Sequence, residues 1–405
     1  MNAICLVIDR WHLGHVGAYG NAWIETPSFD RMACEAFTFD QALISSPRTN
    51  EFYRSLWQGR HPLLRDVDST PAADLPRQLA QARIATTLMT DELAVANHPL
   101  AAGFDELVGL DPPERITAAD DVGATHLAGC FAQIIDWLGA AEGPFMLWVH
   151  LSSMANCWDA PYSFRERYVE PGDPDPPHSA EVPQLILPDG FDPDTLLGIT
   201  QSYAAQVSVL DACFGALLES LDESPTGRDT LLAVLSARGF PLGEHRQVGA
   251  RGETLHSELV HVPMMIRLPD ALGAARRSQA LVAPADLGPT LTEWWSLDGP
   301  GPAGFGHSLL PIVRGEAPTI RDRLMLGSPT SETALRTPAW YMRLSEPPRL
   351  YVKPDDRWEV NDVADRCSEV VEELQAAAGD FQSCLQSNRL DSLQPLGEIL
   401  RNGLD

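Results

Sequence analysis

The sequence predicts an α/β fold with a mostly parallel central sheet, and three observations support this. A short apolar run, Ile4–Ile8, ends in Asp9. This is the pattern of a buried parallel strand that delivers a carboxylate to the carboxyl edge of a sheet. Further apolar runs alternate with stretches of helical spacing, as in βαβ units. The chain has 405 residues, which exceeds the size at which one core stops growing, so we expect a large α/β domain with a smaller appended one.

The individual elements follow from spacing and from the residues that bound them. The predicted elements, in chain order, are helices over 28–37, 51–58 and 75–83, a strand over 85–89, a helix over 122–138, a strand over 145–149, a helix over 203–221 and a strand over 231–235. This last strand points Ser236–Gly239 toward the same edge as Asp9. The segment Glu170–Pro193 is rich in proline, aspartate and glycine, which predicts a surface loop or insertion.

Charge restricts the class of partner. The chain carries 56 acidic and 29 basic residues, a formal charge of −27, which repels nucleic acid and anionic membranes. No run of 18 consecutive apolar residues occurs, and the first strand begins almost at Met1 without a leader pattern. We therefore expect a cytoplasmic, acidic protein that binds neither nucleic acid nor membrane.

Cysteine and lysine usage restricts the chemistry. The seven cysteines form no CxxC pair and are odd in number, so we expect reduced thiols rather than a disulfide framework or a zinc site. Lys353 is the only lysine, and every other basic residue apart from histidine is an arginine. Any reaction that needs a lysine elsewhere in the chain is therefore excluded.

Short motifs along the whole chain carry a family resemblance. They are, in order, Val7–Arg10, Tyr19-Gly20, Thr26–Ala33, Gly59–Pro62, Gly103–Glu106, Ala160–Tyr162, Gly243–His245, Val262–Arg267 and Asp286–Leu291. In this order and spacing the motifs resemble the sulfatases of the alkaline phosphatase superfamily. Near the end, Gly306–Pro311 and Leu350-Tyr351 resemble the small C-terminal subdomain of the same proteins.

The resemblance implies a fold and a domain division. The fold would be alkaline-phosphatase-like, with a mostly parallel central sheet flanked by helices and a small C-terminal α+β subdomain. The sulfatase-like α/β domain would cover residues 1–310 and the small subdomain residues 311–405.

The resemblance also implies a site for Ca²⁺ or another divalent metal held by several oxygens. The family's ligand positions fall on Asp9, Arg10, Ala237 and Arg238, where three aspartates and an asparagine or histidine would be expected. Arginine has a permanent positive charge and no lone pair, so it cannot ligate a metal. Asp9 is the one surviving ligand position. We expect no bound metal and interpret Asp9 as a buried partner of Arg10 or Arg238; the alternative is that it ligates a single metal.

The nucleophile position is altered as well. In the family a cysteine or serine, converted to formylglycine, stands eleven residues before the arginine of a Gly-Arg pair, and counting back from Arg60 leads to Thr49. Glu51 and Tyr53 occupy the positions of the family's following proline and arginine. Threonine cannot become formylglycine, although its hydroxyl can attack directly. The alternative is that Thr49 is a helix N-cap.

The family's cationic residues are replaced by acidic ones, Asp91 and Glu92 after the third strand and Asp159 before Ala160. Arginines instead lie near segments that the fold would bring to one sheet edge: Arg10, Arg48, Arg238 and Arg251. Their guanidinium groups predict binding of sulfate, phosphate or carboxylate without a metal. The alternative is that they form internal ion pairs with Asp9, Asp91 and Asp159.

Two histidines, His150 and His245, lie close to family active-site segments and are secondary catalytic candidates; the alternative is a structural role. The replacements at the metal-ligand, nucleophile and cationic positions all point to lost catalysis. They favour a pseudo-sulfatase with a degenerate active site that binds an anionic small molecule or a protein partner. The alternative is a divergent metal-dependent hydrolase of sulfate or phosphate esters with Thr49 as nucleophile. A third hypothesis is an inactive partner in a complex with a true enzyme.

Overall fold

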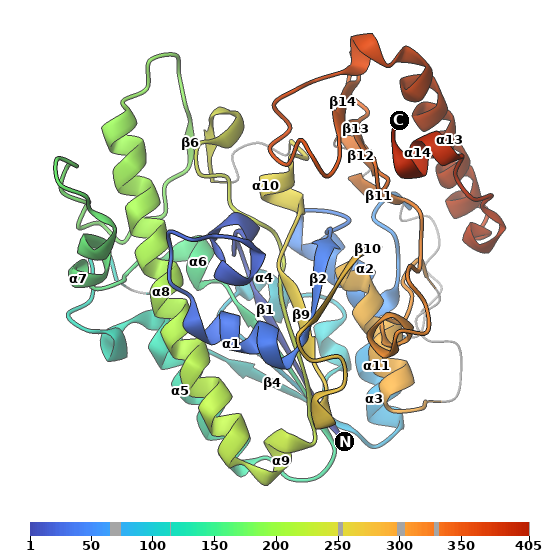
Figure 1. Ribbon diagram of the computed structural model, residues 1–405. Helices are drawn as coiled ribbons and strands as arrows, with labels where there is room; N and C mark the ends of the chain where they lie inside the picture. Colours follow the sequence, from blue (N-terminus) through green and yellow to red (C-terminus); the bar gives the residue numbers. More distant parts are fainter. Residues whose placement is uncertain (65–73, 114, 250–253, 298–303, 328–331, 405) are drawn as a thin grey trace. The chain divides into compact units, whose positions relative to one another are not determined.

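The structure is a computed structural model and describes residues 1–64, 74–113, 115–249, 254–297, 304–327 and 332–404 (Figure 1). The chain forms two compact units, each built from several stretches. The first unit comprises Met1–Thr38, Leu79–Gly252 and Val262–Arg277, and the second comprises Phe39–Gln78, Glu253–His261 and Ser278–Asp405.

The first unit contains the parallel strands that the sequence predicts, which are β1 (Asn2–Ile8), β3 (Ala85–Thr90), β5 (Phe145–Leu151) and β7 (Thr230–Ser236). It also contains a further parallel strand that was not predicted, β4 (Glu106–Gly109). Strand β1 pairs in parallel with β5 and β7, β5 pairs with β3, and β3 pairs with β4. Strand β9 (Met264–Arg267) runs antiparallel to β7. The full order of the strands in this sheet is β10-β2-β9-β7-β1-β5-β3-β4. The boundary between the two units falls within β2 (Phe37–Ala42) and again within β10 (Arg276–Val282).

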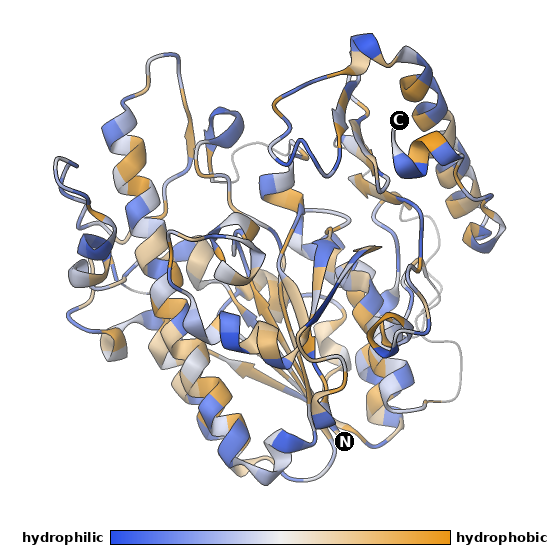
Figure 2. Cartoon of the chain, in the orientation of Figure 1, coloured by the Kyte–Doolittle hydropathy of each residue, from blue (hydrophilic) through white to orange (hydrophobic). Residues whose placement is uncertain are grey.

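Every residue of β1, β5 and β7 is buried, because both faces of this part of the sheet are covered. Figure 2 shows the strands at the centre of the sheet as predominantly hydrophobic. The other helices and strands that lie in the first unit are α1 (Pro27–Glu35), α4 (Leu93–Ala96), α5 (His126–Ala140), α6 (Ser153–Asn156), α7 (Tyr162–Arg165), α8 (Pro193–Glu223), α9 (Pro225–Arg228), β6 (Leu185–Ile186) and β8 (Gln247–Val248).

Helix α8 is the main buried helix of the first unit and packs against α1, α5 and α7 (Figure 1). It begins at Pro193 rather than at Tyr203 because the Asp192 side chain caps it and proline suits the first turn. By length and composition alone α8 could cross a membrane, which is weak evidence, and 72% of its most apolar window is buried inside the unit, as in a core helix.

Strand register brings several chain segments to one edge of the sheet. Ile8 at the end of β1 is level with Leu151 of β5 and Ser236 of β7, and Thr90 at the end of β3 is level with His150. The residues that follow these parallel strands therefore share the carboxyl edge, where open α/β sheets place their ligands.

The second unit contains a small antiparallel sheet, as expected for a C-terminal α+β subdomain. Its strands are β11 (Leu324–Gly327), β12 (Thr333–Arg336), β13 (Trp340–Arg343) and β14 (Arg349–Val352), paired in that order. Helices α13 (Ser368–Gln386) and α14 (Glu398–Asn402) share a hydrophobic core with it. The remaining helices of this unit are α2 (Thr49–Gln58), α10 (Ser257–Val260), α11 (Leu287–Trp294) and α12 (Leu310–Arg314), and α3 (Leu75–Gln81) spans the boundary between the units.

Candidate functional site

Asp9 and Arg238 form a bidentate ion pair at the carboxyl edge of the sheet. Arg238 Nε donates to Asp9 Oδ1 at 2.9 Å, and Arg238 Nη2 donates to Asp9 Oδ2 at 2.8 Å. The Asp9 side chain is 3% exposed and the Arg238 side chain 20% exposed. The expectation that Asp9 is a buried partner of an arginine is confirmed, and the partner is Arg238.

The ion pair also determines the charge state of Asp9. Burial alone would raise the pKa of this carboxyl, but the charge and hydrogen bonds of Arg238, with smaller contributions from Arg10 and His150, lower the pKa below its ordinary value. Both oxygens of Asp9 therefore belong to a charged carboxylate that already accepts from a guanidinium fork.

Arg10 lies next to this pair and is held in an unusual way. Its backbone has a φ of 61°, in the left-handed region that non-glycine residues rarely adopt, and its carbonyl oxygen accepts from the Tyr203 hydroxyl at 2.8 Å. Its Nε and Nη1 are buried and have no hydrogen-bond partner among the described residues. The guanidinium carbon lies 5.8 Å from the centroid of the Phe240 ring. Burial lowers the pKa of Arg10, and the nearby Asp9 carboxylate opposes this.

His150 belongs to the same edge of the first unit. It is fully buried near the end of β5, between Val7 of β1 and Thr90 of β3. Burial lowers its pKa, whereas Asp9 and Asp91 act in the opposite direction. The structure therefore brings Asp9, Arg10, Arg238 and His150 together.

The remaining predicted site residues belong to other segments of the chain. His245 lies in a short helical turn, Glu244–Arg246, with a φ of 47°. Arg48 and Thr49 belong to the second unit, and Arg251 lies outside the described residues. The N-cap interpretation of Thr49 is wrong: Thr49 is the first residue of α2 and Arg48 occupies the N-cap position, with no side-chain capping bond. Arg48 Nη1 lies 3.7 Å from Glu51 Oε1.

Asp91 and Asp159 do not pair with Arg10, Arg48 or Arg238, the predicted arginines that the structure describes. Asp91 Oδ1 accepts from Ser152 N at 2.7 Å, and Asp159 Oδ2 accepts from His126 N at 2.7 Å. Asp91 Oδ2 lies 3.8 Å from Nε2 of His126, and Cys130 lies one turn further along the same helix. Sequence analysis did not predict that Asp91, His126 and Cys130 form a cluster. The spacing of His126 and Cys130, one helical turn apart, is a pattern that could have indicated it.

The lone lysine is part of a buried polar network in the second unit, which sequence analysis also missed. Lys353 Nζ donates to Glu359 Oε1 at 3.0 Å, and the other carboxylate oxygen lies 2.8 Å from His256 Nδ1. Ser257 Oγ also donates to Glu359. Burial would raise the pKa of Glu359, but these partners lower it to about 2.

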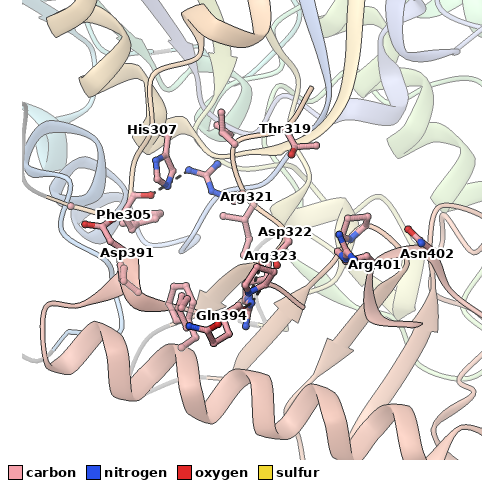
Figure 3. Close-up of a pocket in the computed structure, with 18 residues that line it drawn as sticks. Phe305, His307, Thr319, Arg321, Asp322, Arg323, Asp391, Gln394, Arg401 and Asn402 are labelled. Carbon is pink, nitrogen blue, oxygen red and sulfur yellow. Dashed lines mark hydrogen bonds and ion pairs between the residues drawn. The ribbon is translucent and has the colours of Figure 1, made fainter. Parts of the chain in front are cut away.

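A cavity of about 650 Å³ lies within the second unit, and Figure 3 shows His307, Arg321 and Arg323 among the residues that line it. Two arginines that line this cavity, Arg321 and Arg323, already pair with carboxylates of the protein. Arg321 donates to both oxygens of Asp286, at 2.7 and 2.5 Å, and Arg323 Nε donates to Asp322 at 2.8 Å. These arginines therefore stabilise the walls of the cavity, and the edge around Asp9 remains the stronger candidate site.

Comparison with known proteins agrees with this fold. A solved structure of a phosphonate monoester hydrolase from Agrobacterium radiobacter superposes with a TM-score of 0.76 over 96% of both chains, at 18% identity. This likeness shows that the two chains share a fold. The family model described as Sulfatase matches residues 1–297. The chain belongs to the sulfatase family.

Curated relatives agree on the family but extend beyond this chain. An N-acetylglucosamine-6-O-sulfatase of Bacteroides thetaiotaomicron is 30% identical over 122 residues, which are 30% of this chain and 21% of that protein. A human N-sulphoglucosamine sulphohydrolase is 26% identical over 349 residues, covering 78% of this chain and 66% of that protein. The chain therefore spans between about a fifth and two thirds of these relatives' lengths.

Proposed function

We propose that this protein is a pseudo-sulfatase that binds an anionic ligand, rather than a metal, at the carboxyl edge of its sheet. The observation that carries the proposal is the bidentate ion pair between Arg238 and Asp9. The one carboxylate at a family metal position has both oxygens engaged by a guanidinium group. A divalent cation there would have to displace Arg238 and lie beside two positive charges.

The residues present therefore do not fit the family's divalent metal at Asp9. Arg10 supports an anion in its place. Two buried guanidinium nitrogens that have no hydrogen-bond partner among the described residues are costly, and a ligand that accepts from both would offset that cost. Sulfate, phosphate and carboxylate all offer oxygens that match a guanidinium fork.

The strained backbone of Arg10 also supports a binding role, since left-handed non-glycine residues cluster at ligand and active sites. The ligand would be a small anion or an anionic group on a larger partner. A cytoplasmic location is part of the proposal, and the seven unpaired cysteines favour a reducing compartment.

The first test is calorimetric titration with inorganic sulfate and phosphate in the presence of a chelator. Wild type should bind at least one of these anions, and Arg10→Met should weaken that binding about 10- to 100-fold because charge-assisted hydrogen bonds are lost. Arg246→Met is the control, since Arg246 pairs on the surface with the almost fully exposed Asp189. Equal binding by wild type and Arg10→Met would contradict the proposal.

The alternative function, a hydrolase of sulfate or phosphate esters with Thr49 as nucleophile and Asp9 on a single metal, makes the opposite prediction. We expect purified protein supplied with Ca²⁺, Mg²⁺ or Mn²⁺ to show no turnover of aryl sulfates or aryl phosphates. Turnover that Thr49→Ala abolishes would establish the alternative. His150 and His245 would then be the next residues to substitute.

A further inference from the structure

A second cluster of polar groups lies at the carboxyl edge, two strands from Asp9. Asp91 follows β3, and His126 and Cys130 lie one turn apart on α5. His126 Nε2 is 3.8 Å from Asp91 Oδ2 and 3.6 Å from Cys130 Sγ. The three potential ligand atoms all lie within 4.8 Å of one another.

Asp91 is the informative member of this cluster. Its side chain is 0% exposed, and while Oδ1 accepts from Ser152 N, Oδ2 is buried and accepts no hydrogen bond from any described residue. A buried carboxylate oxygen without a donor is costly and calls for a water molecule or an ion. The oxygen points into the space that it shares with an imidazole nitrogen and a thiol.

We infer that Asp91, His126 and Cys130 form a binding site for Zn²⁺. A tetrahedral zinc ion with oxygen, nitrogen and sulfur ligands places neighbouring ligand atoms about 3.4 to 3.6 Å apart, given Zn–ligand distances of about 2.0 to 2.3 Å. The measured separations of 3.8 and 3.6 Å need only a small adjustment. His126 Nε2 lies 2.7 Å from the carbonyl oxygen of Asp111 and would give up this hydrogen bond to bind zinc, and a water would take the fourth position.

The ligand types select the metal. Ca²⁺ and Mg²⁺ take oxygen ligands, whereas thiolate and imidazole suit zinc. The site departs from the expectation of no zinc site, which rested on the absence of CxxC pairs. It shares no residue with the Asp9–Arg238 pair or with Arg10, so the proposed anion site and this zinc site stand or fall separately.

Cobalt provides the test, because a cysteine thiolate on Co²⁺ gives a near-ultraviolet charge-transfer band and four-coordinate Co²⁺ gives strong visible bands. Chelator-treated protein should bind stoichiometric Co²⁺ with both features, and Zn²⁺ should displace it. Cys130→Ser should remove the charge-transfer band and weaken binding at least tenfold. Asp91→Asn should keep the band and weaken binding at least tenfold.

Cys34→Ser is the matched control, since Cys34 is the exposed thiol in α1, and it should leave the spectrum unchanged. Arg10→Met should also leave it unchanged, which separates this test from that of the anion site. A charge-transfer band that is absent from wild type, or that persists in Cys130→Ser and disappears in Cys34→Ser, would overturn the proposal. If Cys130→Ser fails to fold, an unweakened Asp91→Asn would overturn it.

Discussion

Arg238→Met is expected to lower the free energy of unfolding by about 3 kcal/mol, because it leaves a buried carboxylate without its counter-ion. Asp9 is almost fully buried and its pKa is held below the ordinary value chiefly by Arg238, so the charged form loses its main support. Chemical denaturation of wild type and variant measures the difference. Arg10 remains near Asp9 and limits the loss.

The double variant Asp9→Asn/Arg238→Met separates the cost of an orphaned charge from the contribution of the pair. Because replacing both members of a buried ion pair is often nearly neutral, the double variant should recover most of the lost stability. Arg246→Met provides the surface control and should change the unfolding free energy by no more than about 0.5 kcal/mol. A loss in Arg238→Met as small as in this control would show that the pair does not hold Asp9.

Glu359→Gln is expected to cost about 3 kcal/mol at neutral pH. Its folded-state pKa of about 2, against an ordinary value of 4.5, corresponds to roughly 3 to 4 kcal/mol, because each unit of pKa is about 1.4 kcal/mol. The substitution keeps the shape but removes the charge that faces Lys353, whose side chain is 6% exposed. The loss is measured by chemical denaturation.

The pH dependence of the Glu359→Gln effect has a definite sign. A folded-state pKa below the unfolded one contributes stability that is fully present above about 4.5 and is lost as pH falls toward 2. The stability difference between wild type and Glu359→Gln should therefore shrink below pH 4.5. Glu373→Gln, on the exposed side of α13, is the control and should show no such change. A difference that is constant from pH 7 to pH 3 would contradict the assignment.

Most of the α/β framework follows from local patterns. Strand β1 is predicted because a short, unbroken apolar run ending in Asp9 has the length and pattern of a strand buried on both faces. The antiparallel neighbour β9 and the strand β2 were not predicted, because their short segments become strands only through pairing with distant partners. The early start of α8 was missed because Asp192 and Pro193 lie in a segment assigned to a loop.

The site shows the same division between local pattern and tertiary pairing. The pairing of Asp9 with an arginine could be predicted, since a buried carboxylate needs a counter-charge and two arginines occupy positions where the family has metal ligands. Three-dimensional packing determines that Arg238 binds both oxygens of Asp9, whereas two nitrogens of Arg10 have no partner in the described part of the chain. The spacing of His126 and Cys130 along one helix is a local signal, but their approach to Asp91 depends on the packing of α5 near the end of β3. The pairing of Lys353 with Glu359 depends likewise on the path of the loop after β14.

Anomalous diffraction from crystals soaked with both selenate and Mn²⁺ tests most directly the claim that an anion replaces the metal at the carboxyl edge. Selenate stands in for sulfate, and Mn²⁺ stands in for the family's hard divalent cation. The proposal predicts a selenium peak within hydrogen-bond distance of Arg10 Nε and Nη1, with the Arg238–Asp9 pair intact and no manganese beside Asp9. A manganese peak bound by Asp9, with Arg238 displaced, would contradict it.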